Sequence, residues 1–258
     1  AISWLYFANR LIELPLGIVG VAMGTVLLPE LTRAAPAGDT AFARAASRGL
    51  ELSIGLALPA MLGLMLLSEP IVRLLFEHGA FTAADTRATA LALTWLALGL
   101  PAHVLTKALA PAFFARGDTR TPMLAALAAL AVTVAAALLL ARCRGVAGIA
   151  AAIALGAWIG ALLLLIWARV RFGLALDPAT RARLWRIMLA ALMMGVLLWA
   201  VLRGLAPWLD GGHRLAVAVV LVGLIAAGVA VYAASLAMLG VVRPVDAIRA
   251  LRKPGLHG

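Results

Sequence analysis

The 258-residue sequence is 65% hydrophobic and only 13% charged, whereas soluble globular chains are about 45–50% apolar and about 25% charged. This composition excludes a water-soluble domain and predicts an all-α fold, a polytopic bundle of membrane helices. The formal net charge of +11 does not indicate a nucleic-acid partner, because Lys and Arg occur mostly in short loops between apolar runs, as membrane orientation requires.

Seven apolar segments are each long enough to cross a bilayer. They cover about residues 2–28, 49–67, 88–115, 122–141, 146–168, 186–203 and 215–240. One alternate set of connecting loops carries more than twice as many Lys and Arg residues as the other set. The positive-inside rule therefore places the N-terminus outside and the C-terminus in the cytoplasm. Because the sequence begins with Ala1 inside a helical pattern, we expect it to be the C-terminal part of a longer protein.

The first segment, LYFANRLIELPLGIVGVAMGTVLLPELTR, carries charge inside an apolar helix. An ionisable side chain near the bilayer centre costs roughly 2.5–3.5 kcal/mol, so it normally faces a cavity or a partner. Spacings of three and four residues give one helical face a polar half and a glycine half: Tyr6, Arg10, Glu13, Gly17, Gly20 and Gly24. We expect the polar half, with Asn9, to line a water-filled cavity. The glycine half should pack closely on a neighbouring helix, with a kink at Pro15.

Two cations inside apolar segments are candidates for substrate binding. Arg10 offers a fixed fork of donors to phosphate or carboxylate groups, although an ion pair with Glu13 that only orients helices is the alternative. Lys107 lies in a segment interrupted by Pro101 and Pro111, a pattern typical of a helix that lines a cavity. The alternative for Lys107 is that its side chain extends to the cytoplasmic surface.

The connecting segments predict local structure. In the outer loop 68–87 we expect a short amphipathic piece at 71–76, a turn at Gly79, and an N-cap at Thr82 supported by Asp85. In the inner loop 168–186, Asp177 and Pro178 should start a short surface helix. The arginines of that helix either meet anionic head groups or serve as ordinary anchors.

The cytoplasmic turn ARGDTRTP, residues 115–122, is a candidate gating loop. Its Arg116, Asp118 and Arg120 either steer an anionic substrate or simply form a tight turn. Glycines in the fifth segment predict a close helix contact instead: Gly145, Gly148, Gly156 and Gly160.

Enzyme chemistry is not predicted. The sequence contains no GxxxxGK[ST], CxxC or HExxH motif, so neither a nucleotide-driven motor nor a zinc site is expected. No Ser, His and Asp are placed for acyl transfer. We therefore expect a transporter without a cofactor or a bound metal, rather than a membrane glycosyltransferase or acyltransferase.

Three motifs together resemble those of a known family. The first segment, then LLFEHGAFTAADT, then KALAPAFFARGDTRTP are similar in order and spacing to the MurJ (MviN) lipid II flippases of the multidrug/oligosaccharidyl-lipid/polysaccharide exporter superfamily. Members have fourteen helices, and this chain resembles the last seven. The resemblance implies that residues 1–168 are the second-lobe core, helices eight to twelve. Residues 169–258 would then hold a linker, helices thirteen and fourteen, and a basic tail.

The resemblance also implies a function and its partners. Members flip lipid II, the undecaprenyl-diphosphate-linked peptidoglycan precursor, across the bacterial inner membrane by alternating access, and a first lobe would complete the site. Arg10 would lie in the central cavity, Glu13 would take the matching acidic position, and 186–203 with 215–240 would border a groove for the lipid tail. The run where some members bind sodium offers only Thr133, so the membrane potential or a proton would drive transport instead. Another exporter of the superfamily, for polysaccharide-linked lipids or drugs, is the alternative.

Overall fold

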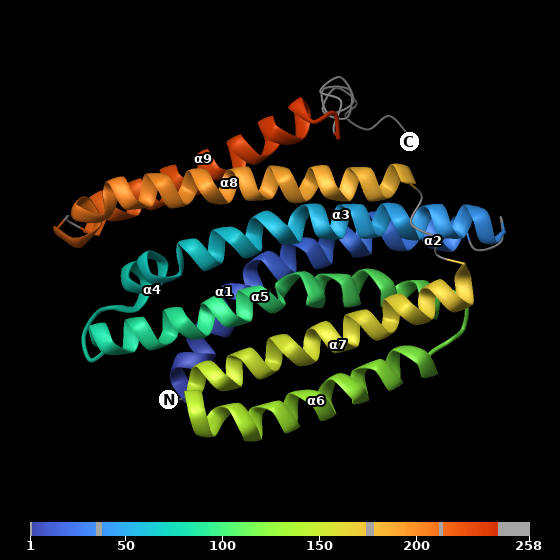
Figure 1. Cartoon of the computed structure of the whole chain (residues 1–258), viewed down its shortest axis with the longest axis horizontal. Coiled ribbons are helices and arrows are strands. Elements are labelled where there is room, and N and C mark those ends of the chain that lie inside the picture. The colour runs from blue at the N-terminus through green and yellow to red at the C-terminus, as the bar shows by residue number, and fades with distance from the viewer. Residues whose placement is uncertain (1, 35–37, 174–177, 212–213, 242–258) are drawn as a thin grey trace, which may run out of the picture.

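The computed structural model describes residues 2–34, 38–173, 178–211 and 214–241, and these residues form helices joined by short turns. The first three elements follow one another closely: α1 (Ile2–Ala22), the π-helix η1 (Met23–Leu27) and α2 (Leu28–Ala34). The remaining helices are α3 (Asp39–Leu66), α4 (Ser68–Phe76), α5 (Ala83–Phe114), α6 (Arg120–Arg144), α7 (Val146–Phe172), α8 (Pro178–Gly211) and α9 (Arg214–Met238). The long helices lie side by side, with α6 along one edge and α8 and α9 along the opposite edge (Figure 1).

Six helices in the described part of the chain are long and apolar enough to span a membrane: α3, α5, α6, α7, α8 and α9. The chain is therefore an all-helical, multi-pass membrane protein, as predicted. The predicted count of seven spans is not confirmed, because the first segment is not among these six. That segment carries Arg10 and Glu13, and its α-helical hydrogen bonding is interrupted by η1.

Most helices extend beyond the apolar runs that predict them. For example, α5 begins at Ala83 and α7 ends at Phe172, since a helix continues through the polar interface where its own backbone bonds still form. The predicted short surface helix after residue 177 is wrong. Pro178 is the first residue of the continuous 34-residue helix α8, while Asp177 lies outside the described residues. The predicted domain division at 168/169 stays a prediction.

Two arginines of the predicted head-group cluster instead hold helices together. Arg183 of α8 donates to Glu51 of α3, with 3.4 Å between Nη1 and Oε2. Arg186 donates to the backbone carbonyl of Leu239, just after α9, at 3.1 Å. A cation at a helix C-terminus complements the helix dipole and satisfies an unpaired carbonyl, so Arg186 joins the start of α8 to the end of α9.

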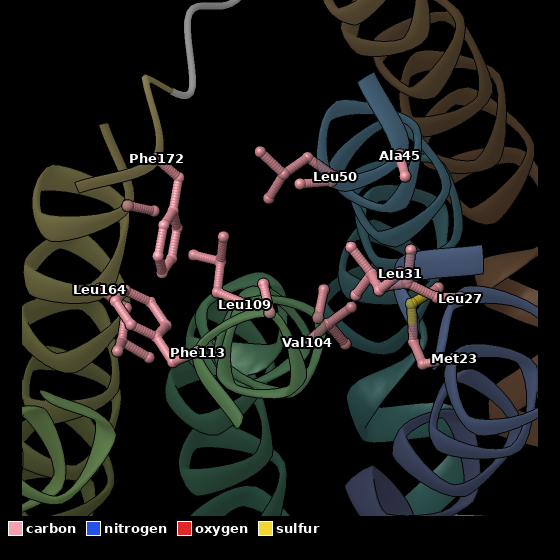
Figure 2. Packing of buried hydrophobic residues seen from close by; sticks show 14 of the residues in the cluster. Met23, Leu27, Leu31, Ala45, Leu50, Val104, Leu109, Phe113, Leu164 and Phe172 are labelled. Atoms are coloured by element: carbon pink, nitrogen blue, oxygen red, sulfur yellow. The ribbon is translucent and has the colours of Figure 1, made fainter. Parts of the chain in front are cut away.

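Helix α5 is the centre of the bundle. Of its most apolar 18-residue window, 67% is buried, against 6% for the equivalent window of α6. Figure 2 shows how Leu109 and Phe113 of α5 lie between Phe172 of α7 on one side and Leu27 and Leu31 of the first segment on the other. Close packing of these side chains fixes the half of the bundle that contains the turn between α5 and α6.

The outer loop forms as its sequence predicts. Helix α4 contains the amphipathic piece, and Gly79 turns the chain at a φ of 63°, where L side chains are disfavoured. Thr82 is the N-cap of α5, and its backbone N–H donates to the Asp85 carboxylate at 2.8 Å while the Thr82 hydroxyl accepts from the Asp85 N–H. This reciprocal capping box satisfies two backbone donors and defines the start of α5.

Glycines bring α6 and α7 into close contact, which confirms the packing prediction for Gly148, Gly156 and Gly160, whereas a Cβ built on Gly145 meets nothing within 4 Å. A Cβ built on Gly148 would lie 2.2 Å from the Leu140 carbonyl oxygen, and one on Gly156 would lie 1.9 Å from the Thr133 hydroxyl. Only a residue without a side chain fits at these positions.

Candidate functional site

The polar half of α1 forms a small hydrogen-bonded cluster. The Arg10 Nη1 and the Glu13 Oε2 are 3.2 Å apart, and the Asn9 side-chain amide donates to the other Glu13 oxygen at 3.0 Å. The Arg10 side chain is 70% exposed and that of Glu13 is 52% exposed. Glu13 thus orients the guanidinium through one nitrogen, and the other donors of Arg10 face outward from the described part of the chain.

The glycine half of α1 behaves differently from the prediction. A Cβ built on Gly17 meets nothing within 4 Å, so no described residue packs closely there. Gly24 falls within η1 rather than in the α-helix. Pro15 lies inside α1 as predicted, and it lines a groove described below. Any close packing at Gly17 therefore has to involve residues outside the described chain, and it stays a prediction.

Lys107 reaches across from α5 to α1. Its Nζ lies 3.7 Å from the position that a Cβ on Gly20 would occupy, and Lys107 is exposed. Because Gly20 has no side chain, the ammonium group lies against the same face of α1 that carries Arg10. This contact favours the cavity interpretation of Lys107 over an extended path to the cytoplasmic surface.

The turn between α5 and α6, which the sequence places in the cytoplasm, is held by its own charges. The Arg116 guanidinium lies over the rings of Phe42 and Phe172, 4.4 Å and 4.9 Å from their centroids. Asp118 accepts from the backbone N–H of Thr121 at 3.0 Å and from its hydroxyl at 2.6 Å. These contacts join the ends of α3, α5, α6 and α7, which is what a structural turn does.

Asp118 also forms an ion pair with Arg171 of α7, while Arg120 is exposed. The hydrogen bonds from Thr121, reinforced by Arg171, hold the pKa of the Asp118 carboxyl below its usual value. The turn is thus stabilised by a carboxylate that stays charged. The predicted gating role of Arg116, Asp118 and Arg120 stays a prediction, and the structure does not bring them together with Arg10.

An apolar groove of about 640 Å³ runs beside α1. Helices α8 and α9 contribute to it, but α1, α3 and α4 form the rest of its wall, for example with Leu14, Leu56 and Leu75. The contribution of α3 was not predicted. Its signal in the sequence is a stripe of residues with little side chain at spacings of four, Gly55, Pro59 and Gly63, which opens space beside the helix.

Helix α1 separates the charged face from this groove. At 100° per residue, the charged stripe with Arg10 and Glu13 and the groove stripe with Leu11, Leu14 and Ile18 are centred roughly 100° apart around the helix axis. Leu11, Leu14 and Ile18 line the groove, and Arg10 and Glu13 are exposed outside it. One helix therefore presents an ionic surface and a hydrocarbon surface on two of its sides.

The residues described by the structure contain no group of three His, Cys, Asp or Glu side chains that could hold a metal ion. Thr133, the candidate polar group for sodium, donates to the carbonyl of Ala129 at 2.8 Å in the contact between α6 and α7. Its hydroxyl proton is thus used within α6.

This arrangement defines a multi-pass helical membrane protein with one charged and one apolar path along the same helix. A family model described as lipid II flippase MurJ matches residues 1–219, and the chain belongs to that family.

Individual relatives support this family assignment. The chain is 44% identical over 237 residues to a probable lipid II flippase MurJ from Rhizobium meliloti, covering 90% of this chain and 44% of that protein. It is 37% identical over 246 residues to one from Vibrio cholerae, covering 93% and 46%. A solved structure titled lipid II flippase MurJ, inward closed conformation, matches with a TM-score of 0.73 and 25% identity over 92% of this chain and 46% of that one. The chain thus spans less than half the length of these relatives.

Proposed function

We propose that this chain is the second half of a lipid II flippase of the bacterial cytoplasmic membrane, with its N-terminus outside and its C-terminus in the cytoplasm. Such a protein moves an undecaprenyl-diphosphate-linked peptidoglycan precursor from the inner to the outer leaflet. The exposed Arg10 guanidinium on α1, in a chain of the lipid II flippase MurJ family, is the observation that carries the proposal. The names of the relatives favour this cargo over drugs or other lipid-linked sugars.

Arg10 is the proposed contact for the diphosphate. A guanidinium binds phosphate oxygens with two parallel hydrogen bonds, which a lysine cannot reproduce. Glu13 holds one side of the guanidinium at 3.2 Å, so its direction is set before the substrate arrives. Because the Glu13 carboxylate partly cancels the charge of Arg10, the cost of keeping Arg10 at membrane depth is lower than for a lone cation.

Lys107 is the proposed second contact on the same face. Its ammonium lies beside Gly20, ten residues from Arg10, which corresponds to about 15 Å of α-helix. The positive-inside orientation puts Lys107 nearer the cytoplasm and Arg10 nearer the outside. A diphosphate that enters from the cytoplasm would therefore meet Lys107 before Arg10 as alternating access proceeds.

The apolar groove is the proposed path of the polyprenyl tail. Its lining is almost entirely hydrocarbon, and its volume is about 640 Å³. Helices α8 and α9 form part of its wall. Head group and tail would then pass on two sides of α1. The energy source is proposed to be the membrane potential or a proton, since the hydroxyl of Thr133 already bonds within its own helix.

The test is growth of a flippase-depleted strain that carries the full-length protein. Arg10→Ala and Arg10→Lys should both abolish growth while expression is unchanged. Arg142→Ala is the matched control, because Arg142 is an exposed arginine in the last turn of α6 that lies neither on α1 nor in the lining of the apolar groove. Normal growth with both Arg10 variants would contradict the proposal.

A further inference from the structure

A proline in α3 leaves one backbone carbonyl without its helical partner. Pro59 lies inside α3 and has no N–H, so the carbonyl of Gly55, four residues earlier, cannot form the usual α-helical bond. In a membrane such a group has no water to replace the bond, and each unpaired polar group is costly. Another part of the protein has to supply a donor.

The donor comes from α9. The Tyr232 hydroxyl donates to the Gly55 carbonyl, with 2.6 Å between the two oxygens. Tyr232 is only 9% exposed and packs in the cluster that joins α8 and α9 to α3 and α4, with Leu67 and Met194. This is a short bond between residues 177 positions apart in the sequence, so it connects the C-terminal helix directly to the core.

The bond lies in the wall of the apolar groove. Gly55, Pro59 and Tyr232 all line it, and Tyr232 contributes the one polar side chain among the described residues that do so. Since its hydroxyl proton is used by Gly55, the groove presents almost only hydrocarbon. Without that hydroxyl, an unpaired carbonyl would face the groove.

We propose that Tyr232 is a positioning residue that locks α9 onto the proline break of α3 and so sets the width of the apolar groove. The role of the groove in holding a polyprenyl tail rests on the function proposed above. The lock itself does not, because it follows from the missing N–H of Pro59 and the position of one hydroxyl.

The proposal is tested with three single variants, two double variants and one control variant of the full-length protein in phosphatidylethanolamine–phosphatidylglycerol vesicles. Tyr232→Phe removes only the hydroxyl. Pro59→Ala restores the backbone N–H, which gives the Gly55 carbonyl its helical partner, and Pro59→Ser does the same with a different side chain. The double variants combine Tyr232→Phe with each. Tyr6→Phe is the control, since Tyr6 is the other tyrosine of the sequence and is 64% exposed.

The readout is the distance between α3 and α9, measured by electron spin resonance between spin labels at Leu52 and Ala234. Both positions are exposed and neither lines the groove. Cys143, the only cysteine of this sequence, is replaced by Ser. Tyr232→Phe should add a longer distance component and lower the ratio of docked to undocked α9 by about tenfold, as expected for leaving one buried acceptor unpaired. Tyr6→Phe should leave the distribution unchanged.

Rescue separates the lock from a general structural effect. In the Pro59→Ala or Pro59→Ser background, Tyr232→Phe should no longer change the distances, since the carbonyl is already satisfied. An unchanged distribution in Tyr232→Phe, or a change that neither Pro59 variant reverses, would overturn the proposal.

A second measurement tests the groove separately. A diazirine-bearing undecaprenyl diphosphate should label α9 less efficiently in Tyr232→Phe. If the distances respond as expected but labelling does not change, the lock is supported and the tail path of the proposed function is wrong.

Discussion

Gly148 offers a direct test of the contact between α6 and α7. A Cβ built there lies 2.2 Å from the Leu140 carbonyl oxygen and 2.6 Å from its carbonyl carbon. Favourable contacts between heavy atoms need about 3.5 Å. The clashing atoms belong to the backbone of Leu140, which cannot rotate away as a side chain could. Gly148→Ala therefore forces the two helices apart by roughly 1 Å. The next close contact along α7 is that of Gly156 with Thr133, where a built Cβ would lie 1.9 Å from the hydroxyl oxygen, and a gap at Gly148 would loosen it as well.

The expected cost follows from overpacking. Forcing an extra methyl group into a well-packed contact costs about 1–3 kcal/mol, and membrane helices have no hydrophobic drive to restore the contact elsewhere. Helix α6 depends on this contact, since only 6% of its most apolar window is buried. For a domain of this size we expect the melting temperature to fall by about 2–4 °C per kcal/mol.

The assay is thermal unfolding of the full-length protein in detergent. Gly148→Ala should lower the melting temperature by about 2–12 °C, combining the two magnitudes above. Gly223→Ala is the matched control, because a Cβ built on Gly223 in α9 meets nothing within 4 Å. If both variants melt at the wild-type temperature, the close packing of α6 on α7 is not what holds α6 in place.

Three further predictions concern other parts of the chain. Thr82→Ala should cost about 1 kcal/mol of stability through the lost N-cap, and hydrogen exchange should accelerate in the first turn of α5. Gly20→Leu should displace the Lys107 ammonium from α1 and reduce flippase-dependent growth as Lys107→Met does, whereas equal growth of Gly20→Leu and wild type would contradict that role. Because bonds from Thr121 hold the Asp118 pKa below its usual value, Asp118 stabilises the fold above the ordinary carboxyl pKa and this stability is lost as pH falls. The difference in melting temperature between wild type and Asp118→Asn should therefore shrink between about pH 5 and pH 3.

Local sequence signals predicted helix starts and close helix contacts well. The capping box of Thr82 and Asp85 depends on residues three positions apart, so it is fully encoded in a short stretch of sequence. The glycine contacts of α7 were likewise predicted from the spacing of small residues. The start of α8 was predicted at Pro178, but not its unbroken length, since the Arg-rich stretch after it is polar enough to resemble a separate surface helix.

The π-helix η1 was not predictable in the same way. It forms where Leu27 packs against α3 so closely that a Cβ on Gly49 would lie 2.5 Å from it. Ser53 of α3 donates to the Gly49 carbonyl at 2.6 Å and lies 3.4 Å from the Met23 sulfur. The contacts of Leu27 with Gly49 and of Met23 with Ser53 join residues more than twenty positions apart, so no short stretch of sequence encodes them.

The candidate site likewise combines features that the sequence predicts with features that depend on how the helices pack. Arg10 and Glu13 could be predicted because charge in an apolar run is conspicuous and their spacing puts them on one face. The approach of Lys107 to Gly20 could not, because it depends on how α5 crosses α1. The groove was predicted only for its α8 and α9 side, because the spacing of Gly55, Pro59 and Gly63 in α3 shows where space opens beside that helix but not which other helices enclose it.

The position of the two surfaces on α1 imposes a strict register under the proposed function. Arg10 and Leu11 are neighbours in sequence, yet one is exposed on the charged face and the other lines the groove. Each residue turns the helix by 100°, so a single inserted residue between Glu13 and Leu14 would rotate the groove-lining stripe that follows by that angle relative to Arg10. A lipid-linked diphosphate needs its charge and its hydrocarbon separated at all times during transfer. The helix that separates them can therefore tilt or kink at Pro15, but a slip by one residue would turn Leu14 and Ile18 out of the groove by about 100°.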